Sequence, residues 1–373
     1  MQSKKKSVET LRVVFAGGGT GGHLYPAIAI AETFQRRVQN FACLFIGTAR
    51  GLEARVVPPL GYRLELVPVR GLLRKLTLSN LLVPFYLMKS IRQCWRLFKK
   101  FDPHLVIGTG GYVSGPALLA AWLSKRQFVV QEQNSFPGLV NRWWGERAAA
   151  AFLSFEESKK FFRRQDHLRV AGNPVRGNLA AGDRRVAAEK WQLASDRTTI
   201  LIFGGSQGAR RINELVSEIL PKLSQLTSFQ IVWATGPIHF EKIAPLAANM
   251  PNVKIVPYLD DMASAYTLAD FVLCRAGAST IFELTNCGLP SILVPFPFAT
   301  ADHQTFNARA LEKTGAARLL VEKELTAEKL LKAVSELATQ PEMRQQMATA
   351  AKKLARPRAA EEIVEVCLSL IDS

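Results

Sequence analysis

The stretch LRVVFAGGGTGGHLYPAIAIAETF, residues 11–34, joins three features that together indicate one type of fold. The apolar, β-branched run Leu11–Ala16 predicts a buried strand, and the apolar periodicity of Leu24–Phe34 predicts a helix. Between them lies the glycine-rich turn Gly17–His23. Glycines let backbone amides approach an anion, and a helix N-terminus adds partial positive charge. The stretch therefore predicts an anion-binding turn, although a turn that only packs a helix against a sheet fits the same pattern.

Two common nucleotide motifs do not fit this turn. Its glycines have the GxGxxG spacing, but a dinucleotide site also needs an acidic residue at the end of the second strand. Here the second strand-like run, Phe41–Ile46, continues into Gly47 and Thr48. A P-loop needs Lys and Ser or Thr where His23 and Leu24 stand. The turn therefore favours neither a nicotinamide-dependent oxidoreductase nor a P-loop nucleotidase.

The composition indicates a globular protein with room for two domains. The chain has 373 residues, of which 48% are hydrophobic. The first ten residues, MQSKKKSVET, lack the apolar core of an export signal, and no uncharged apolar run reaches the roughly 18 residues of a membrane span. The five cysteines are scattered, and none forms a CxxC pair. This pattern predicts reduced thiols and a cytoplasmic setting.

The charge balance points to a polyanionic partner. A formal net charge of +17 suits a nucleic acid, an acidic membrane surface or phosphate-bearing substrates, and charge alone does not distinguish them. Nucleic-acid platforms interleave aromatic and basic residues. Here only Trp95 and Phe98 stand among basic residues in this way, so we expect no nucleic-acid partner.

Strand-like runs alternate with helical patterns along the whole chain, which predicts parallel sheets buried on both faces. The pattern restarts near Ile200, after a polar stretch at residues 156–197, so we expect two doubly wound domains that meet near Asn173–Asn178. Ligands bind beyond the carboxyl ends of such strands, which predicts a site in a cleft between the domains. The clearest runs are Leu11–Ala16, Phe41–Ile46, Leu105–Gly108, Phe128–Gln131, Ile200–Phe203, Ile231–Ala234, Val253–Val256, Phe271–Cys274 and Ser291–Val294.

Further glycine-rich turns follow strand-like runs in both halves. They are GTGGYVSGP at 108–116, GGSQGAR at 204–210 and RAGASTIFEL at 275–284. In the last turn, backbone amides and Arg275 suit a diphosphate, whereas helix capping alone also explains Ser279 and Thr280. Glu283 is placed to accept ribose hydroxyl protons, and favourable charge in the first helical turn is its alternative explanation.

A basic, apolar segment favours contact with an anionic membrane. Residues 66–101 include eight Lys or Arg residues and no Asp or Glu. Within it, the segment Leu72–Tyr86 is the candidate membrane-facing loop. The helical stripe of Met88, Ile91, Trp95 and Phe98 is better explained by packing on a sheet. The candidate membrane-facing residues are Leu72, Leu73, Arg74, Lys75 and Leu76.

Ten motifs in order make the chain similar, nearly from end to end, to the MurG family of bacterial N-acetylglucosaminyltransferases. The resemblance implies a GT-B fold, an α/β architecture of two Rossmann-like domains that face a cleft. The motifs are GGTGGHLYPA (18–27), IGTARGLEARVVP (46–58), GTGGYVSGP (108–116), EQN (132–134), PGLVNR (137–142), GNPVR (172–176), GGSQGAR (204–210), DDMASAYTLAD (260–270), RAGASTIFEL (275–284) and DHQTFNA (302–308).

The resemblance also implies an activity and a location. The expected reaction is inverting transfer of N-acetylglucosamine from UDP-N-acetylglucosamine to the muramoyl 4-hydroxyl of lipid I, an undecaprenyl-pyrophosphoryl-muramoyl-pentapeptide. No metal or cofactor is expected. Residues 1–176 would face the acceptor and an anionic membrane, residues 177–356 would bind the UDP-sugar, and residues 357–373 would pack back on the first domain. The enzyme would lie peripherally on the cytoplasmic face of the inner membrane.

The resemblance places the donor contacts in both domains. They are Thr20, Gly21, Gly22, Asn134, Arg176, Ser206, Leu259, Ala278, Ser279, Thr280, Ile281, Phe282, Glu283 and Gln304, with Asn307 assisting.

Two residues compete for the role of general base. His23 begins a helix, whose dipole keeps the imidazole neutral and able to accept a proton. Glu132 is the other candidate, with a structural hydrogen bond as its alternative role. Gln131 stands where the family often has His, which weakens any role for a histidine there. Adjacent Asp260 and Asp261 resemble a metal motif but are better explained as a helix cap.

Overall fold

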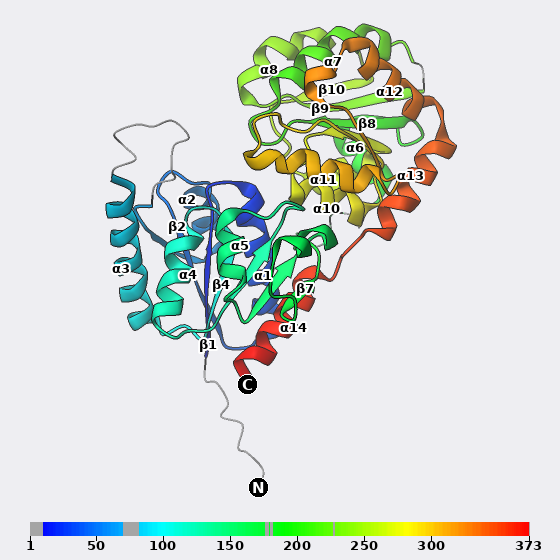
Figure 1. Cartoon of the computed structure of the whole chain (residues 1–373). Helices are drawn as coiled ribbons and strands as arrows, with labels where there is room; N and C mark the ends of the chain where they lie inside the picture. Colours follow the sequence, from blue (N-terminus) through cyan, green and yellow to red (C-terminus); the bar gives the residue numbers. More distant parts are fainter. Residues whose placement is uncertain (1–9, 70–81, 176–178, 180–181, 227, 373) are drawn as a thin grey trace. The chain divides into compact units, whose positions relative to one another are not determined.

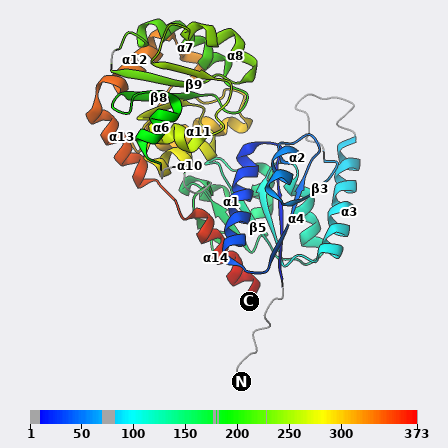
Figure 2. The same cartoon turned by 180° about the vertical axis from the view of Figure 1, so that it is seen from behind.

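The computed structural model describes residues 10–69, 82–175, 179, 182–226 and 228–372. The chain divides into two compact units, each built on a parallel sheet with helices on both faces (Figure 1). Unit 1 comprises Met1–Arg176 and Pro357–Ser373, and unit 2 comprises Gly177–Arg356. Figure 2 shows the same elements from behind.

In the described residues, the sheet of unit 1 has seven parallel strands in the order β3-β2-β1-β4-β5-β6-β7. The strands are β1 Leu11–Gly17, β2 Phe41–Gly47, β3 Arg63–Leu66, β4 Leu105–Gly110, β5 Phe128–Glu132, β6 Ala150–Leu153 and β7 Leu168–Val170. The helices are α1 Gly21–Arg37, α2 Glu53–Val56, α3 Val83–Phe101, α4 Ser114–Leu123, α5 Leu139–Gly145 and α14 Ala359–Asp372, with 3-10 turns at Pro58–Leu60 and Glu156–Phe161.

Two apolar clusters cover the faces of this sheet. Alternate residues of β1 project to opposite sides, so Val14 joins one cluster and Phe15 the other. The Val14 side packs against α3 and α4, and the Phe15 side packs against α1 and α14. Helix α14 lies beside α1, where Arg37 pairs with Glu365 at 3.0 Å (Figure 2). Its buried residue Ile363 makes α14 part of the core of unit 1.

In the described residues, the sheet of unit 2 has six parallel strands in the order β10-β9-β8-β11-β12-β13. The strands are β8 Thr198–Phe203, β9 Phe229–Ala234, β10 Val253–Val256, β11 Phe271–Cys274, β12 Ser291–Leu293 and β13 Ala317–Leu319. The helices are α6 Arg184–Trp191, α7 Arg210–Leu223, α8 Pro237–Ile243, α9 Met262–Leu268, α10 Ala278–Cys287, α11 His303–Glu312, α12 Ala327–Thr339 and α13 Pro341–Lys353, with 3-10 turns at Ala244–Ala247, Thr300–Asp302 and Glu322–Glu324.

The predicted fold class, two Rossmann-like doubly wound α/β domains, is confirmed by these sheets. All nine strand-like runs are strands, and their ends differ from the prediction by at most two residues. The cleft expected between the domains stays a prediction.

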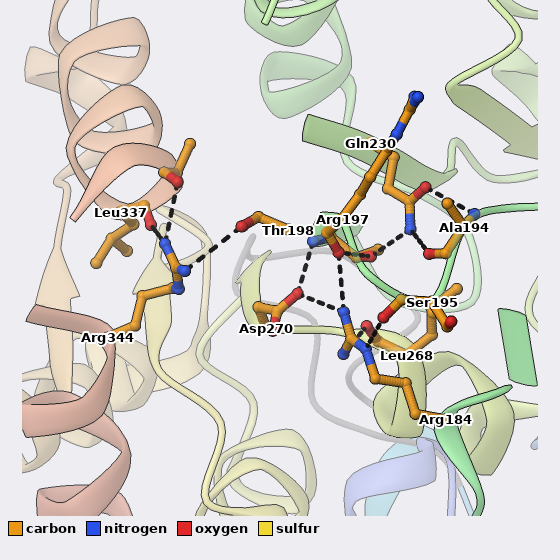
Figure 3. A network of polar contacts seen from close by, with 12 residues as sticks. Arg184, Ala194, Ser195, Arg197, Thr198, Gln230, Leu268, Asp270, Leu337 and Arg344 are labelled. Carbon is orange, nitrogen blue, oxygen red and sulfur yellow. Dashed lines mark hydrogen bonds and ion pairs between the residues drawn. The ribbon is translucent and has the colours of Figure 1, made fainter. Parts of the chain in front are cut away.

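A polar network at the amino ends of β8 and β11 ties unit 2 together (Figure 3). Arg184 donates to Asp270 at 2.8 Å and to three backbone carbonyls. The same carboxylate accepts from Thr199 N at 2.7 Å, and buried Gln230 donates to the Thr199 hydroxyl at 2.8 Å. The glycine-rich turns follow the carboxyl ends of these strands. The network lies at the opposite edge of the sheet, so we interpret it as structural.

Candidate active site

Close backbone packing brings the turns after β1 and β4 together in unit 1. Gly17 pairs with Gly110 in the sheet. A Cβ on Gly17 would lie 1.9 Å from Thr109 Oγ1, and one on Gly110 would lie 2.8 Å from His23 Nδ1. Side chains at either glycine would therefore push apart the elements that hold His23.

The ring of His23, the third residue of α1, is held by two neighbouring strands. Its Nδ1 lies 3.0 Å from Thr109 O and 2.9 Å from Gln133 Oε1. The Thr109 hydroxyl also donates to His23 O at 2.8 Å. The half-buried imidazole is thus fixed by residues 86 and 110 positions away along the chain.

Glu132, the last residue of β5, is only 2% exposed. Its Oε1 accepts from the Asn134 backbone at 2.9 Å and from the Asn134 amide at 3.2 Å. Its Oε2 accepts from Gly138 N at 3.0 Å and from Asn141 Nδ2 at 2.9 Å. A carboxylate offers about four acceptor positions, so donors of the following loop and of α5 occupy them. The geometry favours the structural role for Glu132.

The predicted donor contacts Thr20, Gly21 and Gly22 form the start of α1. Thr20 occupies the N-cap position with extended backbone angles, and its side chain makes no capping hydrogen bond. The first amides of a helix lack partners within the helix. This helix start is therefore suited to an anion.

Glu53, the first residue of α2, is buried and contacts this turn, and it is not among the site residues predicted from the sequence. Its Oε2 accepts from Gly19 N at 2.8 Å, and its Oε1 accepts from Thr48 N at 2.7 Å. A Cβ on Gly47 or Gly51 would lie within 2.3 Å of its side chain. The carboxylate therefore joins the glycine turn to the turn after β2 by hydrogen bonds. The sequence does not reveal this contact, because 34 residues separate Gly19 from Glu53.

In unit 2, the predicted diphosphate turn opens α10 after β11. Gly277 holds the N-cap position without a side-chain cap. The interpretation of Ser279 or Thr280 as the cap is therefore wrong, because both lie inside the first turn. The predicted contacts Ala278, Ile281 and Phe282 have buried side chains, and the backbone amide of Ile281 donates to Gly277 O at 3.0 Å within the helix.

Glu283, on the same helix, is held by a buried tyrosine of α9. The Tyr266 hydroxyl donates to Glu283 Oε2 at 2.8 Å, and Tyr266 is 2% exposed. Burial, together with the neighbouring Glu283 carboxylate, raises the pKa of Tyr266 well above its ordinary value, so the phenol stays protonated and keeps donating. Sequence spacing gave no signal for this pair.

Arg275 is engaged within unit 2. Its guanidinium donates to the carbonyls of Val294 and Pro295 at 3.1 and 3.0 Å, pairs with Glu322, and stacks over Phe296. These contacts occupy the guanidinium and favour a structural role for Arg275 over the expected contact with a diphosphate.

Of the other predicted contacts of unit 2, Ser206 and Leu259 lie on turns that follow strands, and Gln304 and Asn307 lie on α11. Ser206 is exposed after β8, and Leu259 is buried after β10. Gln304 Oε1 accepts from Phe296 N at 2.9 Å, which ties the start of α11 to the loop after β12. Asn307 is buried and donates to a backbone carbonyl at 3.3 Å.

The helix-cap interpretation of Asp261 is confirmed. Its carboxylate accepts from Ser264 N at 3.0 Å at the start of α9. Among the residues that the structure describes, no three His, Cys, Asp or Glu side chains gather as a metal site requires.

The candidate membrane-facing residues and one donor contact lie outside the described residues. They are Leu72, Leu73, Arg74, Lys75, Leu76 and Arg176.

The helix that follows the predicted loop, α3, differs from its expected packing. Ile91 and Phe98 are buried as expected, but Met88 is 54% and Trp95 41% exposed. The expectation is wrong for these two because the buried stripe is centred on Ile91, Cys94 and Phe98, which leaves Met88 and Trp95 on its flank. In the described part of the chain, no helix is long and apolar enough to cross a membrane.

Comparisons with known proteins cover nearly the whole chain. The model of the glycosyltransferase family 28 N-terminal domain matches residues 13–153, and that of its C-terminal domain matches residues 199–363. A Myxococcus xanthus relative is 44% identical over 97% of this chain and 93% of its own, and a Desulforamulus reducens relative is 40% identical over 95% and 97%. Both are named UDP-N-acetylglucosamine–N-acetylmuramyl-(pentapeptide) pyrophosphoryl-undecaprenol N-acetylglucosamine transferase. The crystal structure of Acinetobacter baumannii MurG has a TM-score of 0.76 and 30% identity, and covers 95% of this chain and 98% of its own.

Proposed function

The chain belongs to glycosyltransferase family 28, and we propose that it transfers N-acetylglucosamine from UDP-N-acetylglucosamine to the muramoyl 4-hydroxyl of lipid I. The observation that carries this proposal is identity of 40% or more, over nearly the full chain, to transferases of that name. The product would be lipid II, a precursor of peptidoglycan.

Unit 2 is proposed to hold the donor. The start of α10 offers backbone amides to the diphosphate, and the carboxylate of Glu283 accepts hydrogen bonds from the ribose. Backbone groups around Leu259 frame the uracil, while Gln304 and Asn307 lie on the helix that would face the sugar. Ser206 completes the set proposed for unit 2, and the predicted donor contacts Asn134 and Arg176 belong to unit 1.

Unit 1 is proposed to hold the acceptor and the general base. The acceptor 4-hydroxyl attacks the anomeric carbon as the bond from that carbon to the UDP oxygen breaks, which inverts the configuration. The hydroxyl proton passes to the base, and UDP leaves with both electrons of the broken bond. Helix-start amides stabilise the growing negative charge on the diphosphate.

The test is release of UDP from UDP-N-acetylglucosamine in the presence of a lipid I analogue, with and without EDTA. We expect acceptor-dependent release that EDTA does not reduce. Glu283→Ala and His23→Ala should each lower turnover at least 100-fold, whereas Glu328→Ala, at an exposed glutamate of α12, should not. The absence of acceptor-dependent release from the folded wild-type protein would refute the function, and near wild-type rates in both site variants would refute the site.

We also propose that unit 1 binds the anionic cytoplasmic face of the inner membrane. Support comes from the eight cations without acids at residues 66–101 and from the exposed flank of α3. On that flank, Phe85 is 66% exposed beside Met88, and Lys99 Nζ lies 3.7 Å from the Trp95 ring centre. Apolar side chains bordered by cations suit an acidic lipid surface.

Vesicle sedimentation tests this second proposal with two triple variants. One changes Leu72, Leu73 and Leu76 to Ser, and the other changes Phe85, Met88 and Trp95 to Ser. Each should reduce sedimentation with phosphatidylglycerol vesicles, and high salt should reduce it in the wild type. Ile238→Ser in unit 2, at a residue 74% exposed, is the control. Unchanged sedimentation of both triple variants would refute the proposal.

A further inference from the structure

Two glutamines beside Glu132 form a buried amide pair next to His23. Gln131 belongs to β5 and Gln133 follows its last residue, and a hydrogen bond joins the two side chains. Both side chains are buried, and the amide of Gln133 donates to the side-chain oxygen of Gln131. Buried amides are held in one orientation by their hydrogen bonds.

The surroundings of Gln133 fix which end of its amide faces His23. Its Nε2 lies 2.7 Å from Thr109 O and 3.1 Å from Gln131 O. Main-chain carbonyls only accept hydrogen bonds, so the NH₂ group must lie on that side. The Gln133 oxygen is thereby directed to His23 Nδ1, 2.9 Å away.

Gln131 reinforces this orientation from its other end. Its Nε2 donates to Ser154 Oγ and to Asn173 Oδ1, both at 3.2 Å. The Ser154 hydroxyl in turn donates to the backbone carbonyl of Glu132 at 2.8 Å. The oxygen of Gln131 is left facing the NH₂ group of Gln133, so the two amides point in one direction.

The tautomer of His23 follows from this direction. Its Nδ1 faces two acceptors, Thr109 O and Gln133 Oε1, so Nδ1 carries the hydrogen. In a neutral imidazole, Nε2 then holds the lone pair. We propose that Gln133, oriented by Gln131, is a positioning residue that fixes the Nδ1–H tautomer of His23 and so makes Nε2 the atom that accepts the proton of the acceptor hydroxyl.

This inference rests on the proposed function and decides between its two candidate bases. The oxygens of Glu132 accept four hydrogen bonds, three from the loop that follows it and one from Asn141 of α5. Proton transfer to Nε2 gives an imidazolium whose Nδ1–H still points at two oxygens. Their partial negative charges stabilise the cation formed at the transition state.

The first test measures the tautomer on the enzyme without substrate. Protein labelled with ¹⁵N in its five histidines gives ring-nitrogen shifts, and the loss of signals in His23→Asn assigns His23. We expect a protonated Nδ1 and an unprotonated Nε2 in the neutral ring. The opposite tautomer would overturn the proposal, and this result does not depend on whether the enzyme transfers the expected sugar.

The second test changes the amide pair. Gln133→Met keeps the side-chain length and removes the oxygen, so we expect both tautomers in the spectrum and a kcat lowered about 10- to 100-fold, a part of the roughly 100- to 10,000-fold that general-base catalysis contributes. The KM for UDP-N-acetylglucosamine should change less than twofold. Gln131→Met should lower kcat less and shift the tautomers of His23 in the same direction. This variant replaces Gln133→Met in the test if Gln133→Met does not fold.

Gln230→Met is the matched control, because Gln230 is a buried glutamine at the amino edge of the other sheet (Figure 3). It should lower stability but leave kcat per folded molecule and the His23 spectrum unchanged. Wild-type kcat in folded Gln133→Met, or in folded Gln131→Met where the first variant fails to fold, would overturn the proposal. Failure of the proposed function would instead appear as absent UDP release in the wild type.

Discussion

Replacing Tyr266 with phenylalanine should weaken the binding of UDP about five- to tenfold, and only when the ribose carries its hydroxyls. The Tyr266 hydroxyl donates to Glu283 Oε2 at 2.8 Å from a buried position. A hydrogen bond to a charged group contributes about 1.5–3 kcal/mol to its partner. The variant keeps the charge of Glu283 and loses only its orientation, so we expect about 1–1.5 kcal/mol of this to appear in binding.

Isothermal titration with UDP and with 2′,3′-dideoxy-UDP measures this effect in the wild type, Tyr266→Phe, Glu283→Gln and the double variant. The penalty of Tyr266→Phe should disappear with the dideoxy nucleotide and in the Glu283→Gln background. Tyr62→Phe, which removes a hydroxyl that donates to Gln35 at 2.9 Å, is the control and should bind both nucleotides normally.

Equal weakening of both nucleotides by Tyr266→Phe would refute this reasoning, because the loss would then not pass through the ribose. A wild-type protein that binds both nucleotides equally would instead refute the ribose contact of Glu283.

Three further predictions concern stability and thiol chemistry. Glu53→Gln should lower the free energy of unfolding by about 2–3 kcal/mol in urea titrations, because an amide NH₂ would face backbone N–H groups; an unchanged midpoint would contradict this. Ala301→Gly should raise the free energy of unfolding by up to about 1 kcal/mol, because Ala301 has φ 52°, a left-handed conformation that strains a residue with a Cβ atom. A lower urea midpoint for this variant would contradict the backbone strain. Burial raises the pKa of Cys43 and Cys287 from 9.0 to about 12, so at pH 8 their thiolate fraction should be about 1,000-fold smaller in the folded protein than in urea, and both should react more slowly with a disulfide reagent. The stability linked to these raised pKa values should fall as the pH rises above 9, and equal thiol rates in the folded and unfolded protein would refute the burial effect.

Burial explains which strands the sequence predicted. The nine predicted strands include the central ones of both sheets, where both faces are covered and the runs are continuously apolar. Among the strands not predicted, β3 is an edge strand with the charged sequence RLEL, and β7 and β13 are three-residue edge strands. β6, AAFL, lies inside the sheet, but its alanines have low strand propensity.

The glycine-rich turns could be predicted, but the side chains that hold them could not. Each turn follows a strand directly, so sequence order places it at the carboxyl edge of a sheet. The partners of these turns come from distant segments: Gln133 lies 110 residues from His23, and Glu53 lies 34 residues from Gly19. No local pattern records such pairs, because they form only when the sheet brings the strand ends together.

Of the two buried carboxylates described in unit 1, one narrows the part of the glycine turn that is able to bind an anion. Glu53 accepts from the amide of Gly19, whereas Glu132 accepts from Asn134, Gly138 and Asn141, which lie outside this turn. Each carboxylate is held by backbone donors, so its charge is balanced locally and does not need a cation. An incoming phosphate would meet repulsion at Gly19, where a negative charge already sits, and attraction at the helix start. Within this turn, we therefore expect an anion to be attracted at the helix start, Gly21 and Gly22, and not at Gly19.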